Sequence, residues 1–425
     1  MKSLASALLV VLLAPVVSAQ VSLNPPTPAQ QKITWAQAAI AAHPDHSQPY
    51  NDLAVAYVHR ARETADTSYY GQAEAELQKS FQIAPNNVEG QRARTMILLG
   101  RKDFSGALDL AKSLNKRTPD DVLSYGLVAD ADMELGNYKD AELEAQWMLD
   151  IRPGNVPGLL RGAHLRRLFG DAEGSMDFFS QAYQQTPPTQ VEDQAWILTE
   201  MADLQLSIGN TDGAEELLHS ALEKFPGYFL SLETLARAQT AKQQDLEAVE
   251  LLRWRNKAFS TSASRYALAE ALERAGLKVE ADATFAEFEQ DARRVIHADD
   301  NANAELIRYY LGRGHNSKEA LRIAAIERER QHDVYTQDAY AWALYANGQF
   351  PQAQKEMEEA LGVGIREAAI FYHAGAIAER SHDRAAATRY LKESLALNPS
   401  AELAGAVREV LDRLTPASAT SRHSH

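Results

Sequence analysis

The sequence predicts an all-α solenoid of about ten helix–turn–helix units with a capping helix at each end. Three observations lead to this fold class: prolines recur at a fixed spacing, small residues recur at fixed places between them, and strong helix formers such as Ala, Leu, Glu, Gln and Arg dominate the chain. No alternating β-branched stretch indicates a strand. The length of 425 residues is compatible with this, because a solenoid grows without enlarging its core.

The prolines set the period. Pro85, Pro119, Pro153 and Pro187 follow one another at intervals of 34 residues, and Pro226 and Pro399 continue the series at other spacings. A period of about 34 residues fits one helix–turn–helix pair. Since proline cannot continue a helix, each of these prolines is predicted to mark the end of a second helix.

Small residues recur at two places in each unit. Two antiparallel helices approach closely only where one of them presents a small side chain. With each proline counted as position 32, position 8 lies within the first helix and position 20 opens the second. Position 20 holds Ala73, Ala107, Ala141, Ser175, Ala214, Ala248, Ala281, Ala320, Ala353 and Ala387, and position 8 holds Ala54, Thr95, Ala129, Ala163, Ala202, Ala236, Ala269, Arg308, Ala341 and Gly375.

Glycine recurs in the turn between the two helices of a unit. A glycine just past a helix end supplies the left-handed backbone that stops the helix. The turn at position 15 is predicted to take this form at Gly136, Gly170, Gly209, Gly276 and Gly348.

This pattern resembles the tetratricopeptide repeat (TPR) family, and residues 122–153 and 334–364 match it best. The resemblance covers about ten units from Ser47 to Pro399. It implies a right-handed superhelix whose concave groove is lined by the first helices, at positions 2, 5, 9 and 12. The chain departs from the family where Arg308 takes the place of the small residue at position 8, and where units near 262 and 301 have no terminal proline.

Two insertions interrupt the period. One lies in residues 60–72, between the helices of the first unit, and the other lies in residues 188–193, after Pro187. Such insertions are ordinarily tolerated surface structure, and loops also carry binding sites. Both interpretations stay open from the sequence.

The two ends of the chain have their own patterns. Residues 1–19 have the form of a cleaved secretory signal peptide, so the protein is expected to be exported, to the periplasm or outside the cell. Residues 20–28 are expected to form a linker, 29–46 an N-terminal half-repeat, 401–414 a C-terminal capping helix and 415–425 a disordered tail. No cysteine is present, so neither a disulfide nor a lipidated cysteine is available.

The sequence offers no catalytic or cofactor motif, so we expect neither an enzyme nor a bound cofactor or metal. The formal net charge of −15 disfavours nucleic acid and anionic membranes as partners. Two short basic clusters, Arg161–Arg166–Arg167 and Arg253–Arg255–Lys257, are interpreted as solvated faces because acidic residues surround them.

The groove positions give the candidate site. In the early units they are mixed: Asn51, Val55, Arg92, Met96, Asp130, Met133, His164 and Arg167. In the late units they are aromatic, and aromatic side chains bury a large area while keeping a polar edge. The candidate partner-binding residues are Tyr266, Tyr309, Tyr335, Trp342, Tyr345 and Tyr372. The alternative is that these rings pack between neighbouring helices.

The sequence therefore favours an exported, non-catalytic scaffold that binds a protein or peptide partner in its groove. One alternative is a component that assists the assembly of cell-envelope complexes. A second is an envelope enzyme that uses paired carboxylates, for which the sequence shows no fixed pair.

Overall fold

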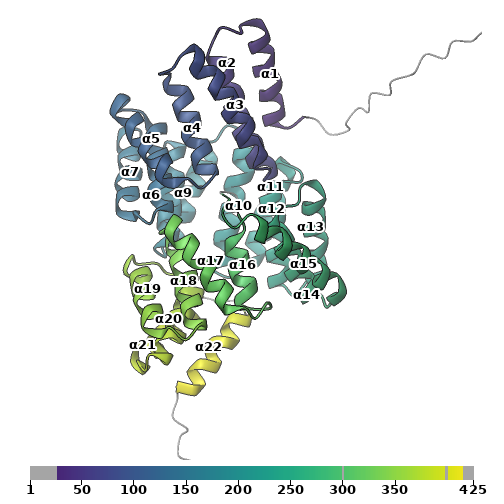
Figure 1. The fold of residues 1–425 in the computed structure, drawn as a ribbon, viewed down its shortest axis with the longest axis vertical. Coiled ribbons are helices and arrows are strands. Elements are labelled where there is room, and N and C mark those ends of the chain that lie inside the picture. Colours follow the sequence, from purple (N-terminus) through teal and green to yellow (C-terminus); the bar gives the residue numbers. More distant parts are fainter. Residues whose placement is uncertain (1–25, 299–300, 398–400, 415–425) are drawn as a thin grey trace, which may run out of the picture.

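The computed structural model describes residues 26–298, 301–397 and 401–414, and these contain 22 helices and no strand (Figure 1). The signal peptide predicted at 1–19, most of the linker and the tail at 415–425 lie outside the described residues. Within the described part, none of the helices combines the length and the apolar character that crossing a bilayer requires.

The helices follow one another with short connections. Their bounds are α1 Pro28–Ala42, α2 Gln48–Thr64, α3 Ser68–Ile83, α4 Val88–Gly100, α5 Phe104–Arg117, α6 Val122–Glu134, α7 Tyr138–Ile151, α8 Val156–Leu168, α9 Ala172–Gln185, α10 Val191–Ser207, α11 Thr211–Lys224, α12 Phe229–Ala241, α13 Asp245–Ala258, α14 Ser262–Arg274, α15 Lys278–Arg294, α16 Asn303–Leu311, α17 Ser317–Arg330, α18 Val334–Ala346, α19 Phe350–Gly362, α20 Ala368–Arg380, α21 Arg384–Ala396 and α22 Ala401–Leu414.

Helices α2 to α21 pack as ten successive pairs, each against the next, which confirms the all-α solenoid. At the first end α1 packs on α2, where Glu63 accepts hydrogen bonds from the Thr27 hydroxyl and from the Ala29 backbone N–H. At the other end α22 packs on α20 and α21 and buries Val407 and Val410 against Leu391.

The described prolines lie where the period predicts. Pro85, Pro119, Pro153, Pro187 and Pro226 each stand two residues after the last residue of α3, α5, α7, α9 and α11, which are the second helices of their pairs. Pro399 lies outside the described residues.

The small residues are the points where the helices of a pair approach. All ten residues at position 20 are buried, as are the small residues assigned to position 8. Arg308 is the exception because it is exposed, and its neighbour Ile307 is buried instead. Helix α16 ends early at Leu311 and a longer turn follows, so the register assigned from Ala320 is shifted in this helix.

The left-handed turn occurs at all five predicted glycines, whose φ angles lie between +73° and +81°. The same conformation occurs at the same position in units without glycine, at Lys102, Gln243, His315 and His382. The backbone turn is therefore a property of the whole array, and packing imposes it where the residue does not favour it.

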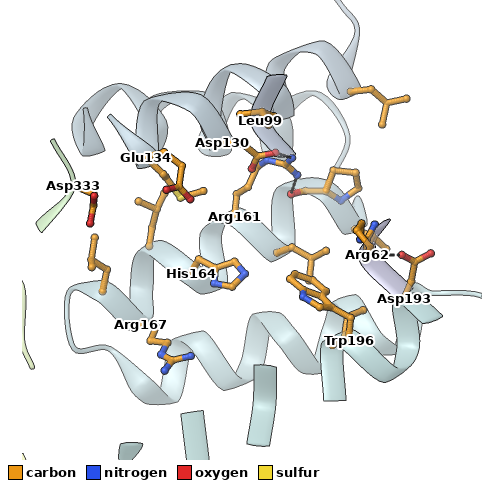
Figure 2. Close-up of a pocket in the computed structure, with 18 of the residues that line it drawn as sticks. Arg62, Leu99, Asp130, Glu134, Arg161, His164, Arg167, Asp193, Trp196 and Asp333 are labelled. Carbon is orange, nitrogen blue, oxygen red and sulfur yellow. Dashed lines mark hydrogen bonds and ion pairs between the residues drawn. The ribbon is translucent and has the colours of Figure 1, made fainter. Parts of the chain in front are cut away.

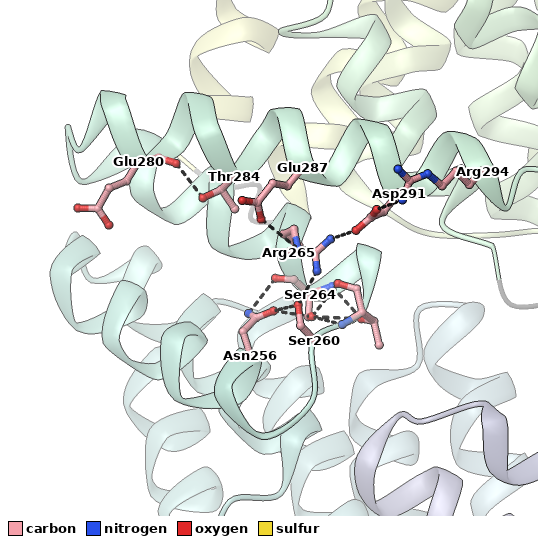
Figure 3. A network of polar contacts seen from close by, with 10 residues as sticks. Asn256, Ser260, Ser264, Arg265, Glu280, Thr284, Glu287, Asp291 and Arg294 are labelled. Carbon is pink, nitrogen blue, oxygen red and sulfur yellow. Dashed lines mark hydrogen bonds and ion pairs between the residues drawn. The ribbon is translucent and has the colours of Figure 1, made fainter.

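A polar network replaces proline at the connection between α13 and α14 (Figure 3). The Asn256 side chain accepts from Ser260 and Ser264 at 3.0 and 2.8 Å, while Thr261 and Ser264 form a capping box that starts α14. Arg265 then pairs with Asp291 on α15. These contacts define the end of one unit and the start of the next without a proline.

The first insertion is mostly helical, the second supplies the first residues of α10, and the two meet. The first lengthens α2 to 17 residues and the second lengthens α10 to 17 residues. Arg62, at the end of α2, pairs with Glu192 at 3.2 Å and Asp193 at 3.4 Å, at the start of α10. The Tyr228 hydroxyl also donates to Glu192, at 3.1 Å. The insertions thus join the first pair of helices to the fifth.

The chain also returns on itself later in the sequence. Residues at the α6–α7 and α8–α9 turns pack against the α17–α18 and α19–α20 connections, an interface that we call the seam. The Val334 backbone N–H donates to the Tyr138 hydroxyl at 2.9 Å, and the Arg366 backbone N–H donates to the Leu168 carbonyl at 3.2 Å. In Figure 1, α18 accordingly lies beside the helices of the third and fourth pairs.

Glycines allow the close approach at the seam. A Cβ atom on Gly136 would lie 2.5 Å from the His332 carbonyl oxygen, and one on Gly170 would lie 2.7 Å from the Arg366 side chain. Around these contacts Met133, Leu168 and Phe169 belong to the same apolar cluster as Val334 and Ile365. The seam is therefore a packed interface between units far apart in the sequence.

Candidate functional site

A large cavity lies on the inner side of the solenoid, and we call it the inner cavity. Its volume is about 1020 Å³. Groove positions of the third, fourth and fifth pairs line it, together with the two insertions and the start of α18 (Figure 2). Its lining residues include Arg62, Leu123, Asp130, Met133, Glu134, Leu160, Arg161, His164, Arg167, Gln190, Asp193, Trp196, Asp333 and Tyr335. This volume is at the upper end of ligand pockets, which span roughly 300–1,000 Å³.

The arginines of the inner cavity all have carboxylate partners. Arg161 pairs with Asp130 at 2.5 Å and donates to the Gly126 and Pro157 carbonyls, each at 2.9 Å. Arg167 pairs with Asp203 and lies 3.8 Å from Glu200. Because Arg62 pairs with the start of α10, no arginine of the lining is left to attract an anion.

The structure corrects the expectation that the two basic clusters are solvated faces. Arg161 and Arg167 are not a solvated face, because they are partly buried and lie on the cavity wall, while Arg166 is exposed. In the second cluster Arg255 is buried and pairs with Glu233 at 2.6 Å. A short basic run on a helix points in several directions, and the sequence does not show which charges the neighbouring helix neutralises.

His164 stands in the middle of the cavity wall beside Trp196 (Figure 2). Its ring lies 5.8 Å from the Trp196 ring and meets Phe179 edge-on at 5.2 Å. Desolvation, together with the positive charges of Arg167 and Arg161, lowers the pKa of His164 to about 4. The imidazole is therefore neutral at neutral pH and adds no positive charge to the cavity.

Glu134 differs from the other charged residues of the cavity because it has no hydrogen-bond or ion-pair partner among the described residues. In Figure 2 it lies between Asp130 and Asp333. Although solvent reaches its side chain, desolvation by the surrounding protein, followed by the charges of Asp333 and Asp130, raises the pKa of Glu134 to about 7. Glu134 is thus a carboxylate of the cavity that neither a hydrogen-bond donor nor an ion-pair partner among the described residues satisfies.

Three of the six aromatic candidates come together on the late pairs. The Trp342 ring stacks on Tyr345 at 4.5 Å and on His373 at 4.2 Å, and Tyr372 lies beside it at 5.8 Å. The His373 Nδ1 lies 2.8 Å from Asp338. We call these four rings the aromatic stack. All four are half-buried, so part of the stack stays open to solvent.

A fourth candidate, Tyr335, lines the inner cavity and is 50% exposed. It lies seven residues before Trp342 on α18, a separation of about 10 Å along a helix. Helix α18 therefore links the inner cavity to the aromatic stack, and together they form a continuous row of groove positions.

The remaining two candidates lie elsewhere. Tyr266 is buried against Phe285 and Phe288 in the core of the seventh and eighth pairs. Tyr309 stacks on Phe285. The register of α16 is shifted, so Tyr309 does not occupy the groove position that the sequence assigned to it. Both rings pack between helices, which is the alternative noted for them from the sequence. Whether any of the six binds a partner stays a prediction.

No group of histidine, aspartate and glutamate side chains in the described residues is arranged to hold a metal ion. Asp130 and Asp193 are instead paired with arginines, Asp333 caps α18 and Glu134 is exposed. What this arrangement can do is bind: it offers apolar area at Trp196, Leu160 and Leu123, together with charged groups in the same cavity.

No family model and no curated protein matches the chain. Solved structures do match it. The Cut9–Hcn1 hetero-tetramer of the APC/C matches with 14% identity and a TM-score of 0.45, over 90% of this chain and 58% of that chain. The human IFIT1 dimer with PPP-AAAA matches with 15% identity and a TM-score of 0.47, over 86% of this chain and 85% of that chain.

TPR proteins are among these structures. A thermophilic TPR protein of Thermus thermophilus matches with 20% identity and a TM-score of 0.39, over 46% of this chain and 99% of that chain. At these identities the likeness concerns the fold alone.

Proposed function

We propose that this protein is a non-catalytic scaffold that binds an extended segment of a partner protein along the inner side of its solenoid. The observation that carries the proposal is the row of groove positions on α18, which runs from Tyr335 in the inner cavity to Trp342 and Tyr345 in the aromatic stack. A groove of this kind suits an extended chain, because apolar and aromatic side chains supply buried area and fixed polar groups set the orientation.

The aromatic stack supplies the anchor. Large aromatic side chains dominate many binding interfaces, since each buries a large area at a small cost in side-chain entropy. Trp342 and Tyr345 stack in parallel at 4.5 Å, and both side chains are half-buried, so part of each stays open to a partner. Their chemistry suits an apolar or proline-rich stretch of a partner.

The test compares capture of partners from a cell-envelope extract. A Trp342→Ala, Tyr345→Ala double variant is expected to lose the captured protein while it keeps the helical content and melting temperature of the parent. The matched control is Trp254→Ala, since Trp254 is 51% exposed and lies on α13, a second helix of its pair. Equal capture by the double variant and the parent would remove the aromatic stack from the binding site.

The proposal includes export. It rests on residues 1–19, which combine Lys2, an apolar run and small residues before Gln20. The measurement is amino-terminal sequencing of the protein recovered from the periplasm or the medium, with Gln20 expected as the first residue. A mature protein that still begins at Met1 and stays in the cytoplasm would contradict it.

A further inference from the structure

The inner cavity carries more carboxylates than cations. Its lining has three arginines and four carboxylates, namely Asp130, Glu134, Asp193 and Asp333. Directly behind them, Glu192, Glu200 and Asp203 pair with the same arginines, and Arg237 adds a further guanidinium, 2.6 Å from Asp203. Seven carboxylates therefore stand against four arginines in and around the cavity.

The excess negative charge is concentrated around Glu134, on which the charges of Asp333 and Asp130 act. Asp333 caps α18, where its carboxylate accepts the backbone N–H groups of Tyr335 and Thr336 at 2.9 and 3.1 Å. Asp130 is held by Arg161. Glu134 lies between them without a hydrogen-bond or ion-pair partner among the described residues. The cation that lowers its pKa is Lys102 in the α4–α5 turn, which acts through its charge without an ion-pair contact.

Two groups on the remaining neighbouring elements complete the surroundings of Glu134. Tyr138 on α7 is oriented by its hydrogen bond from Val334, and its pKa is raised, chiefly by burial. Arg161 on α8 is committed to Asp130 and to two carbonyls. Arg161 is therefore not free to neutralise the Glu134 carboxylate.

The same cavity also offers apolar area, at residues on α6, α8, α10 and α18. Leu123 and Tyr335 are each 50% exposed, and Trp196 and Leu160 lie half-buried beside them. An occupant that uses both features has apolar side chains and a positive charge that reaches Glu134. A polyanion would meet an unpaired carboxylate and arginines that are already neutralised, so its binding would be opposed.

We propose that the inner cavity binds a lysine- or arginine-containing peptide segment of the partner, with the cationic side chain on Glu134 and the apolar side chains against Trp196 and Tyr335. This inference rests on the proposed function, because it names the chemistry of the segment that the groove receives. It commits to a cationic peptide and not to a nucleic acid.

The direction of the pH dependence follows from Glu134. A cation beside this carboxylate favours its charged form, so binding lowers its pKa and releases a proton. Because the pKa of free Glu134 is about 7, the carboxylate is charged above this pH and protonated below it. Binding of the cationic segment is therefore expected to strengthen as pH rises through neutrality.

The test uses fluorescein-labelled short peptides that share the same apolar residues. One carries lysines, the second has glutamines at those places and the third has glutamates; an oligo-uridylate serves as the nucleic-acid probe. Fluorescence anisotropy with the full-length protein is measured at about pH 6 and about pH 8, the two sides of the Glu134 titration. Glu134→Gln is compared with Glu142→Gln, an exposed residue of α7 outside the cavity.

The lysine peptide is expected to bind at about pH 8 roughly tenfold more tightly than the glutamine peptide, the factor that corresponds to one pKa unit. Glu134→Gln is expected to remove this advantage and most of the pH dependence, while Glu142→Gln behaves as the parent protein. Glu134→Gln keeps the size of the side chain and removes an unpaired charge, so the variant is expected to fold.

Other outcomes overturn the inference. If the lysine and glutamine peptides bind equally, or if Glu134→Gln binds the lysine peptide as the parent does, the cavity does not select a cation and the proposed function still stands. If the oligo-uridylate binds more tightly than the lysine peptide, the ligand of the cavity is a nucleic acid and not a peptide. If no peptide binds although partner capture depends on Trp342 and Tyr345, the inner cavity is not the site. If capture is also independent of those rings, the proposed function fails as well.

Discussion

Asp132 on α6 and Glu144 on α7 each have a buried carboxyl oxygen without a hydrogen-bond partner among the described residues. Lys112 lies 3.7 Å from Asp132 and is the cation that acts on this pair. Desolvation, followed by the charge of Asp132, raises the pKa of Glu144 to about 8. At neutral pH Glu144 is therefore mostly protonated, and two like charges are not buried together.

This pair predicts how stability changes with pH. The folded protein keeps the Glu144 proton up to about pH 8, whereas the unfolded chain loses it near the ordinary value of 4.5, so the free energy of unfolding falls as pH rises between these values. Glu144→Gln is expected to remove that fall, so that the variant exceeds the parent in stability above about pH 8 and equals it near about pH 5.

Urea denaturation across this pH range measures the effect. Glu142→Gln is the control, because Glu142 is exposed on the same helix. A stability difference between Glu144→Gln and the parent that stays constant with pH would show that Glu144 is not the titrating group.

Single residues were also the part of the fold that the sequence predicted best. The alanines at position 20, such as Ala141, are buried because only a small side chain fits between the helices, and their regular spacing reveals this need. Lys102 and Gln243 adopt the left-handed turn without glycine, so the pattern of glycines shows only part of that turn. Arg308 was assigned to the wrong register because α16 is shorter than its neighbours.

At the scale of helices, two glycine turns with the same backbone differ in their surroundings: Gly136 lies in the seam, and Gly276 lies outside it. Gly136 and Gly276 have the same φ of +76°. A Cβ atom on Gly136 would collide with the His332 carbonyl, whereas nothing lies within 4 Å of one on Gly276. Comparing these two glycines therefore separates the backbone requirement for glycine from the packing requirement of the seam.

Replacing each of these glycines by alanine tests the seam. Gly276→Ala is expected to lose about 1–2 kcal/mol of unfolding free energy, the cost of a left-handed alanine. Gly136→Ala is expected to lose more and also to increase the radius of gyration, because the added Cβ pushes His332 away and opens the seam. Chemical denaturation and small-angle X-ray scattering measure these changes. Equal losses with an unchanged radius of gyration would show that the seam does not hold the two parts together.

The insertions show what the sequence did not reveal at this scale. Their positions at 60–72 and 188–193 follow from the displaced period, but their contact through Arg62 and Glu192 does not. In the sequence each of these two residues resembles an ordinary surface charge. Only the curvature of the intervening units brings them together, and a repeat pattern that specifies contacts between neighbours carries no information on this curvature.

At the scale of the whole molecule, the solenoid closes part of its inner side. The insertions join the first pair to the fifth, and the seam joins the third and fourth pairs to the last two. Val334 and Tyr138 meet although 196 residues separate them. These two contacts enclose the inner cavity. The early groove residues Asp130 and His164, which the sequence described only as part of a mixed set, therefore line a cavity.

The central claim is that the partner binds on this inner side. Its most direct test is photo-crosslinking from a benzophenone amino acid placed at Tyr335 or at Trp254, one in the inner cavity and the other on a second helix, with matched exposures of 50% and 51%. The account predicts that a partner protein from the envelope extract is attached from position 335 and not from position 254. Attachment from position 254 without attachment from position 335 would contradict it.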